Sequence, residues 1–126
     1  VTNPPFGSSV KGSQTFRDDL IFETSNKQLG FFQHIYNNLK PGGRAAVVFP
    51  DSVLSIEGIG VQIRKEFLEK CILHTVLRLP QGIFYTPSVR TNLLFFYKKK
   101  ISKKRIKIYG FMITEHRYQN LENLIL

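Results

Sequence analysis

Two continuous apolar runs place the strongest limit on the fold of this chain. Ala45–Phe49 and Asn92–Tyr97 lack the alternation of polar and apolar residues that marks a strand with one face in water. Each run is typical of a strand that is covered on both faces. Because such a strand needs other layers packed against it, the pattern favours an α/β fold.

Two amphipathic helices are predicted between these strands. In the first, Ser25 and Gln28 form a capping box, and apolar residues at helical spacing follow as far as Leu39. The sequence Lys40-Pro41-Gly42-Gly43 ends this helix. The second runs from about Gly60 to Cys71, with Cys71 on the apolar side and Glu66 and Lys70 paired on the exposed side.

Polar residues interrupt the run from Leu73 to Leu79, which therefore resembles an edge strand. The more apolar Asn92–Tyr97 is then expected between Ala45–Phe49 and Leu73–Leu79. No helix separates it from the preceding strand, so it should be antiparallel to its neighbours. The predicted sheet is mixed, with one further strand at Arg105–Phe111 and a short helix near the end of the sequence.

The composition of the chain limits its setting and partners. The length of 126 residues suits one small domain, and the net charge of +9 suits a polyanion such as nucleic acid, although a solvated surface or an acidic protein partner would also explain it. A single cysteine excludes an internal disulfide and indicates a cytoplasmic setting. No apolar run is long enough to span a membrane, and no histidine has neighbours at metal-ligand spacing.

The four residues after the first two carry the clearest chemical signal. They are Asn3, Pro4, Pro5 and Phe6. Val1 and Thr2 read as the end of a strand, which the prolines cannot continue. A plain turn is the simplest alternative, but asparagine before two prolines and an aromatic residue after them is a rare combination.

This combination suits the activation of a planar amine. The exocyclic amine of adenine is a weak nucleophile, because its lone pair is delocalised into the ring. The Asn3 side-chain carbonyl and the Pro4 backbone carbonyl can each accept one of its hydrogens, and the prolines fix the backbone. Phe6 offers a ring for stacking. A base in a duplex would have to flip out to reach such a site, and catalysis would rest on positioning and electrostatics.

The chain resembles the modification subunits of type I restriction-modification systems. Those proteins combine an Asn-Pro-Pro-Phe-Gly motif with signatures that appear here in the same order. The matching segments are Leu39–Arg44, Ala46–Val48, Pro50-Asp51, Ile63–Lys65, Leu79–Phe84 and Thr91–Phe96. The resemblance covers residues 1 to about 100.

The resemblance implies transfer of a methyl group from S-adenosylmethionine to adenine in DNA. Residues 1–100 would form the target-base half of a Rossmann-like methyltransferase domain, and residues 101–126 a basic extension. The family's Gly-rich cofactor loop is expected upstream of Val1, and Gly58-Ile59-Gly60 is interpreted as a helix lead-in. The implied partners are DNA, a specificity subunit, a restriction subunit and the N-terminal half of the domain. Two alternatives are an RNA or protein-glutamine methyltransferase, and an inactive remnant or binding module.

A dense basic stretch is the candidate contact with DNA phosphates. It comprises Lys98, Lys99, Lys100, Lys103, Lys104, Arg105 and Lys107. The alternative is a solubilising hairpin tip. Asp51, Thr91 and Asn92 are secondary candidates, since ligands of α/β sheets gather where strands end. Local roles, as a loop cap or at a strand start, would explain them equally well.

Overall fold

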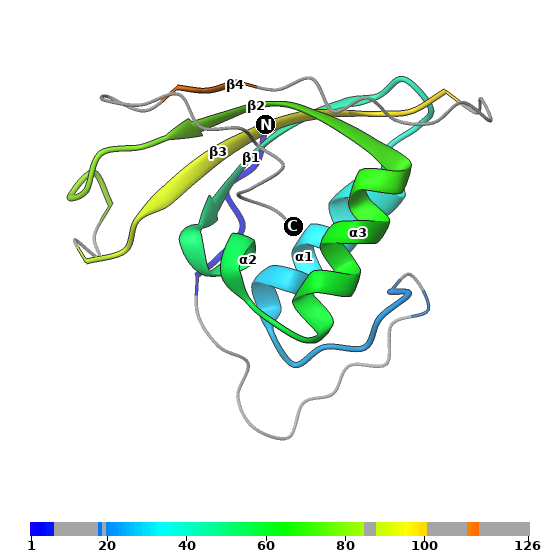
Figure 1. The fold of residues 1–126 in the computed structure, drawn as a ribbon, viewed down its shortest axis with the longest axis horizontal. Helices are drawn as coiled ribbons and strands as arrows, with labels where there is room; N and C mark the ends of the chain where they lie inside the picture. Colours follow the sequence, from blue (N-terminus) through cyan, green and yellow to red (C-terminus); the bar gives the residue numbers. More distant parts are fainter. Residues whose placement is uncertain (7–17, 19, 85–87, 101–110, 114–126) are drawn as a thin grey trace.

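The computed structural model describes residues 1–6, 18, 20–84, 88–100 and 111–113. The helices are α1 (Lys27–Asn38), α2 (Asp51–Ser55) and α3 (Ile59–Lys70), and the strands are β1 (Arg44–Pro50), β2 (Cys71–Arg78), β3 (Thr91–Lys98) and β4 (Phe111–Ile113). All three helices lie on one side of the sheet (Figure 1). The predicted α/β architecture is confirmed, and α2 is a short helix that the sequence did not indicate.

The sheet has the strand order β1-β3-β2-β4. Strand β3 is antiparallel to both β1 and β2, as predicted from the contrast between the apolar runs. Strand β4 pairs in parallel with β2, so the sheet is mixed. The predicted strand at Arg105–Phe111 lies outside the described residues except for Phe111, which begins β4.

The prediction that Leu73–Leu79 is an edge strand is wrong, because β4 covers its outer side. The polar interruption has another cause. The pairing of β2 with β3 shifts between Leu73 and Thr75, and His74, the residue left out of the pairing, is exposed. A bulge therefore turns this side chain to solvent within the strand.

The core lies between the sheet and the helices. Five buried aromatic residues fill it, namely Phe32, Tyr36, Phe49, Phe67 and Phe96. Phe67 of α3 contacts Phe32 of α1 and Phe96 of β3, with ring centroids 4.7 and 4.9 Å apart. Aromatic pairs in this range add to the stabilisation that burial gives, and they fix both helices against β1 and β3.

Both predicted helices begin or end differently from the sequence prediction. Asn26, not Ser25, caps α1, since its side-chain oxygen accepts from the backbone N–H of Leu29 at 3.0 Å. Helix α3 ends at Lys70, and Cys71 begins β2. Cys71 is fully buried, as expected of a core residue, and burial raises the pKa of its thiol to about 11.

The predicted pair between Glu66 and Lys70 is present, with 2.5 Å between Oε1 and Nζ. It does not face water as expected. The Glu66 side chain is only 13% exposed, and its Oε2 also accepts from the Tyr36 hydroxyl at 2.6 Å. The pair therefore joins α3 to α1. No helix in the described part of the chain is long and apolar enough to cross a membrane.

Candidate active site

The Asn3–Phe6 segment passes the carboxyl end of β1. Thr2 forms a parallel bridge with Val47, in which its N–H donates to Ala46 O at 3.0 Å and its carbonyl accepts from Val48 N–H at 3.1 Å. The interpretation of Val1-Thr2 as a strand end is thus confirmed as one bridge at Thr2. Since the pairing is parallel, the following residues reach the edge where β1 ends.

The exposure of the motif suits its predicted roles. Pro4 is buried, whereas Asn3 is exposed and Phe6 is half-buried. No described residue forms a hydrogen bond with the Asn3 side chain or the Pro4 carbonyl. The buried Pro4 anchors the segment. Asn3 Oδ1 and the Pro4 carbonyl oxygen, which are predicted to accept the amine hydrogens, accept no hydrogen bond from any described residue.

Phe84 is a residue that sequence reasoning did not select. Its ring lies 5.9 Å from that of Phe6, at an interplanar angle of 88°. Phe84 comes from the connection between β2 and β3, far from Phe6 in the sequence. The two rings together form an aromatic corner at the edge that carries Asn3. The only sequence signal was the position of Phe84 at the end of the Leu79–Phe84 signature.

Asp51, Arg78 and Asn92 form a polar cluster at the same end of the sheet. Asp51 follows β1, Arg78 ends β2 and Asn92 lies at the start of β3. The Asp51 carboxylate accepts from Arg78 Nη2 at 3.0 and 3.1 Å, one bond to each oxygen, and from Asn92 Nδ2 at 2.5 Å. Asn92 is fully buried. Asp51 and Asn92 were secondary candidates in the sequence, whereas Arg78 was taken only as a polar interruption.

Backbone bonds bring this cluster to the strand ends. The Asp51 N–H donates to Arg90 O at 2.9 Å, and the Leu79 N–H donates to Thr91 O at 3.0 Å. The Thr91 hydroxyl is buried, and no described residue forms a hydrogen bond with it. The ends of β1 and β2 and the start of β3 are therefore held together beside the Asn3–Phe6 segment.

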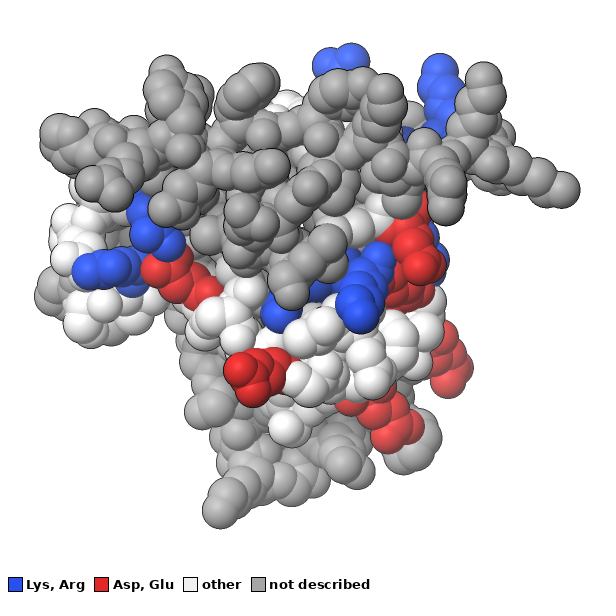
Figure 2. Space-filling model, in the orientation of Figure 1, with Lys and Arg blue, Asp and Glu red and all other residues white. Residues whose placement is uncertain are grey.

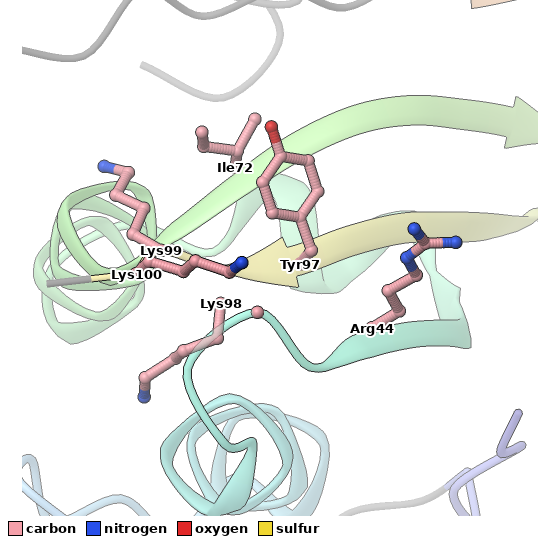
Figure 3. A pocket seen from close by; sticks show the side chains of 7 residues that line it. Arg44, Ile72, Tyr97, Lys98, Lys99 and Lys100 are labelled. Atoms are coloured by element: carbon pink, nitrogen blue, oxygen red, sulfur yellow. The ribbon is translucent and has the colours of Figure 1, made fainter.

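The described part of the basic stretch lies at the opposite end of the sheet. Lys98, Lys99 and Lys100 line an open hollow of about 450 Å³ with Gly42, Arg44, Ile72 and Tyr97 (Figure 3). Lys98 Nζ donates to Tyr36 O at 2.7 Å, in the last turn of α1. Lys99 Nζ donates to Leu68 O at 2.6 Å and Glu69 O at 2.7 Å, in the last turn of α3.

These two amines satisfy carbonyls that a helix end leaves without partners. Their side chains point away from each other in Figure 3, each toward its own helix. Burial lowers the pKa of Lys99. Lys103, Lys104, Arg105 and Lys107 lie outside the described residues. Contact between the basic stretch and DNA stays a prediction, and Lys98 and Lys99 have a structural role in addition.

On the face presented in Figure 2, the charged side chains of the described residues are not gathered by sign. Figure 2 shows basic and acidic side chains close to one another on the face that it presents. Among the described residues, no group of three or more histidine, cysteine, aspartate or glutamate side chains could hold a metal ion.

The described glycine turns do not fit a cofactor loop, which joins the carboxyl end of a strand to a helix. Gly42 precedes β1, Gly82 lies between two strands, and Gly58 caps α3 after α2. At Gly60 a Cβ atom would stand 2.9 Å from the Ile56 side chain, so close packing explains this glycine. None of these described glycines therefore forms a Gly-rich cofactor loop.

Comparison with known proteins places the chain in a family. Residues 1–123 match N-6 DNA methylase. The chain belongs to the N-6 DNA methylase family. Among its relatives is the type I restriction enzyme EcoKI methylase subunit of Escherichia coli K12, which is 55% identical over 102 residues; the match covers 81% of this chain and 19% of that protein.

Solved structures agree with this assignment. The crystal structure of the EcoKI M protein is 50% identical, with a TM-score of 0.70, and the match covers 86% of this chain and 22% of that one. The methyltransferase subunit of a type I restriction-modification system from Streptococcus thermophilus is 31% identical with a TM-score of 0.66, covering 88% and 24%. The family resemblance inferred from the sequence is thereby confirmed. The chain spans about a fifth of the length of these relatives.

Proposed function

We propose that this chain forms the target-base side of an adenine-specific DNA methyltransferase of the type I modification family, within a Rossmann-like domain. The observation that carries the proposal is the position of Asn3–Phe6. The segment passes the carboxyl end of β1, where ligands of α/β sheets bind, with Phe84 and the Asp51 cluster beside it. The family membership supports the same chemistry.

In this proposal Asn3 and Pro4 activate the amine of the target adenine. The Asn3 Oδ1 and the Pro4 carbonyl each accept one N–H of the amine, which draws the nitrogen toward a tetrahedral form with an available lone pair. The exposed Asn3 can reach a base that arrives from solvent, and the buried Pro4 holds its carbonyl in place. Two preoriented acceptors stabilise the charge that develops on nitrogen as the methyl group arrives.

The aromatic corner would receive the flipped base. Stacking on Phe6 replaces the stacking that the base loses when it leaves the duplex, and Phe84 supports Phe6 through its edge contact.

The methyl donor of the family is S-adenosylmethionine, which supplies an electrophilic methyl group when bound. Its binding residues are expected outside the described ranges. The proposed partners are a specificity subunit that reads the DNA sequence and a restriction subunit. The proposed location is the cytoplasm. The division between a catalytic part ending at residue 100 and a basic extension over 101–126 also stays a proposal.

A chimeric subunit tests this function. Residues 1–100 of this chain replace the matching segment of the EcoKI methylase subunit, and the chimeric subunit is assembled with the specificity subunit of that system. Transfer of labelled methyl groups to adenine in cognate DNA is measured. The wild-type chimeric subunit should methylate the DNA, and Asn3→Ala should slow methylation by about 10²–10³, the cost of losing one preorganised group that stabilises the transition state.

Asn38→Ala is the matched control. Asn38 is exposed at the end of α1 and hydrogen-bonds His34 of the same helix, so its loss should leave methylation unchanged. Near-normal turnover by the Asn3→Ala protein would exclude the mechanism. An inactive wild-type chimera that assembles and binds DNA would favour the alternative of a remnant or binding module.

A further inference from the structure

We propose that Arg78 binds a backbone phosphate of the DNA strand that carries the target adenine, and that Asp51 and Asn92 hold its guanidinium in place for this contact. The inference rests on the proposed function and adds a substrate contact that the Asn3–Phe6 motif does not provide. It follows from the geometry of the polar cluster at the carboxyl end of β1 and β2.

The first argument concerns the donors of Arg78. Its Nη2 donates to both oxygens of Asp51, and its Nε lies 3.5 Å from Asn92 Oδ1. No described residue accepts a hydrogen bond from Nη1. A guanidinium is a planar group whose remaining N–H donors suit a phosphate. The bonds to Asp51 fix one side of this plane and leave the Nη1 side available.

The second argument concerns burial. The Arg78 side chain is 35% exposed, whereas Asn92 behind it is fully buried. Asn92 donates to Asp51, which itself follows directly from the buried residue Pro50. The buried Asn92, which bonds Asp51 and lies near Arg78 Nε, thus anchors an ion pair whose two side chains are each 35% exposed. This arrangement reduces the side-chain entropy that Arg78 would otherwise lose on binding an anion.

The third argument concerns charge and position. Arg90 is exposed next to the cluster, since its carbonyl accepts from the Asp51 N–H. Two arginines against one aspartate leave a positive balance at this edge. The edge is also the one that carries Asn3 and Phe6. The phosphates that flank a flipped base lie close to the site that the base enters. A cation at this edge is therefore near the backbone of the strand being modified.

The test measures DNA binding by the chimeric subunit as a function of salt concentration. Arg78→Gln should reduce the slope of log K against log salt by about 0.9, the contribution of one phosphate contact. Arg78→Lys keeps the charge and should keep most of the slope. Lys65→Gln is the control, because Lys65 is exposed in the middle of α3 and belongs neither to the polar cluster nor to the basic stretch. The slope for this variant should equal that of the wild-type protein.

A second measurement changes the DNA, and its first step uses the wild-type protein. DNA in which single phosphates beside the target adenine are replaced by neutral methylphosphonates should bind more weakly at one position. Arg78→Gln should lose no further affinity on that DNA, because the same contact is already missing.

The outcomes separate the two proposals. If the wild-type chimera methylates adenine but the Arg78→Gln slope is unchanged, Arg78 has only a structural role and the inference is wrong. If Arg78→Gln does not fold, a wild-type protein that is insensitive to every neutral phosphate near the target overturns the inference. If the wild-type chimera binds DNA and transfers no methyl group, the proposed function fails, and the inference loses its premise.

Discussion

The two ends of the sheet use polar residues in opposite ways. At the carboxyl end of β1 and β2, the Asp51 carboxylate holds Arg78 and Asn92, while Asn3 and the Nη1 group of Arg78 have no described partner. At the other end, the amines of Lys98 and Lys99 donate to the last turns of α1 and α3. The first end has polar groups without a described partner, whereas two cations of the second end, Lys98 and Lys99, are bound to helix carbonyls.

This difference shows that a dense run of charges in the sequence can include side chains that are already bound within the fold. The basic stretch is the densest run of cations in the sequence, yet its described amines at Lys98 and Lys99 are bound to backbone carbonyls. The carboxyl end has few charges, but they are oriented and partly exposed. Fixed polar groups near a strand end are a stronger indication of ligand binding than the number of charges alone.

The largest effect in this comparison is expected for the aromatic corner. Phe6→Ala should weaken capture of the flipped adenine by about 1–3 kcal/mol, the range for loss of one base–aromatic stack. Phe84→Ala should cost less, about 0.5–1.5 kcal/mol, because it removes the edge contact that supports Phe6. The measurement is fluorescence of 2-aminopurine placed at the target position, which rises when the base leaves the stack.

Tyr97→Ala provides the control from the other end of the sheet. Tyr97 is an aromatic residue that is 37% exposed beside the basic hollow. Its removal should leave the fluorescence titration unchanged. If Tyr97→Ala and Phe6→Ala weakened base capture equally, the two ends would not differ in function as proposed.

Most of the sheet could be predicted from the sequence, because continuous apolar runs mark two of its strands. This pattern located Ala45–Phe49 and Asn92–Tyr97 and predicted that the later strand inserts between the earlier ones. The expected burial on both faces is not found among the described residues, since the three helices lie on one side of the sheet and buried residues alternate with partly exposed ones along β3. The position of Leu73–Leu79 could not be predicted in the same way. A bulge at His74 exposes one side chain and gives the appearance of an edge, and local sequence does not distinguish the two causes.

The candidate site could be predicted only where it is continuous in the sequence. Asn3–Phe6 is one segment with a recognisable pattern. The contact of Phe6 with Phe84 and the bonds among Asp51, Arg78 and Asn92 join residues far apart in the chain. They depend on the order of the strands, since it is β3 between β1 and β2 that brings the three strand ends together.

The next effect tests the structural use of charge at the basic end. Lys99→Met keeps the length and apolar stem of the side chain but removes the amine that donates to Leu68 O and Glu69 O. Loss of a cation at a helix C-terminus should destabilise the last turn of α3 by about 1 kcal/mol. Hydrogen exchange of the amides in this turn should become about fivefold faster, with the methylation rate unchanged.

Lys65→Met is the matched control for this local measurement. Lys65 is exposed in the middle of α3 and no described bond from its amine reaches the helix end. Exchange in the last turn should therefore stay at the wild-type rate. Equal acceleration in both variants would show that the effect comes from loss of charge in general and not from the bonds of Lys99.

The smallest expected effect is on DNA binding by the basic stretch. Among the described residues, Lys100 is the one that tests it. Lys98 and Lys99 are engaged with helix carbonyls, whereas Lys100 is exposed with its side chain against Gly42. If the stretch contacts phosphates, Lys100→Gln should lower the slope of log K against log salt by at most about 0.9. Neutralising Lys98 and Lys99 as well should add little to that change, because their amines are directed toward α1 and α3. A salt titration of DNA binding by the chimeric subunit measures both. An unchanged slope for Lys100→Gln would assign this lysine to a solvated hairpin tip. A large additional decrease of the slope on neutralising Lys98 and Lys99 would show that these amines leave their helices to bind DNA. That result would remove the contrast between the two ends of the sheet.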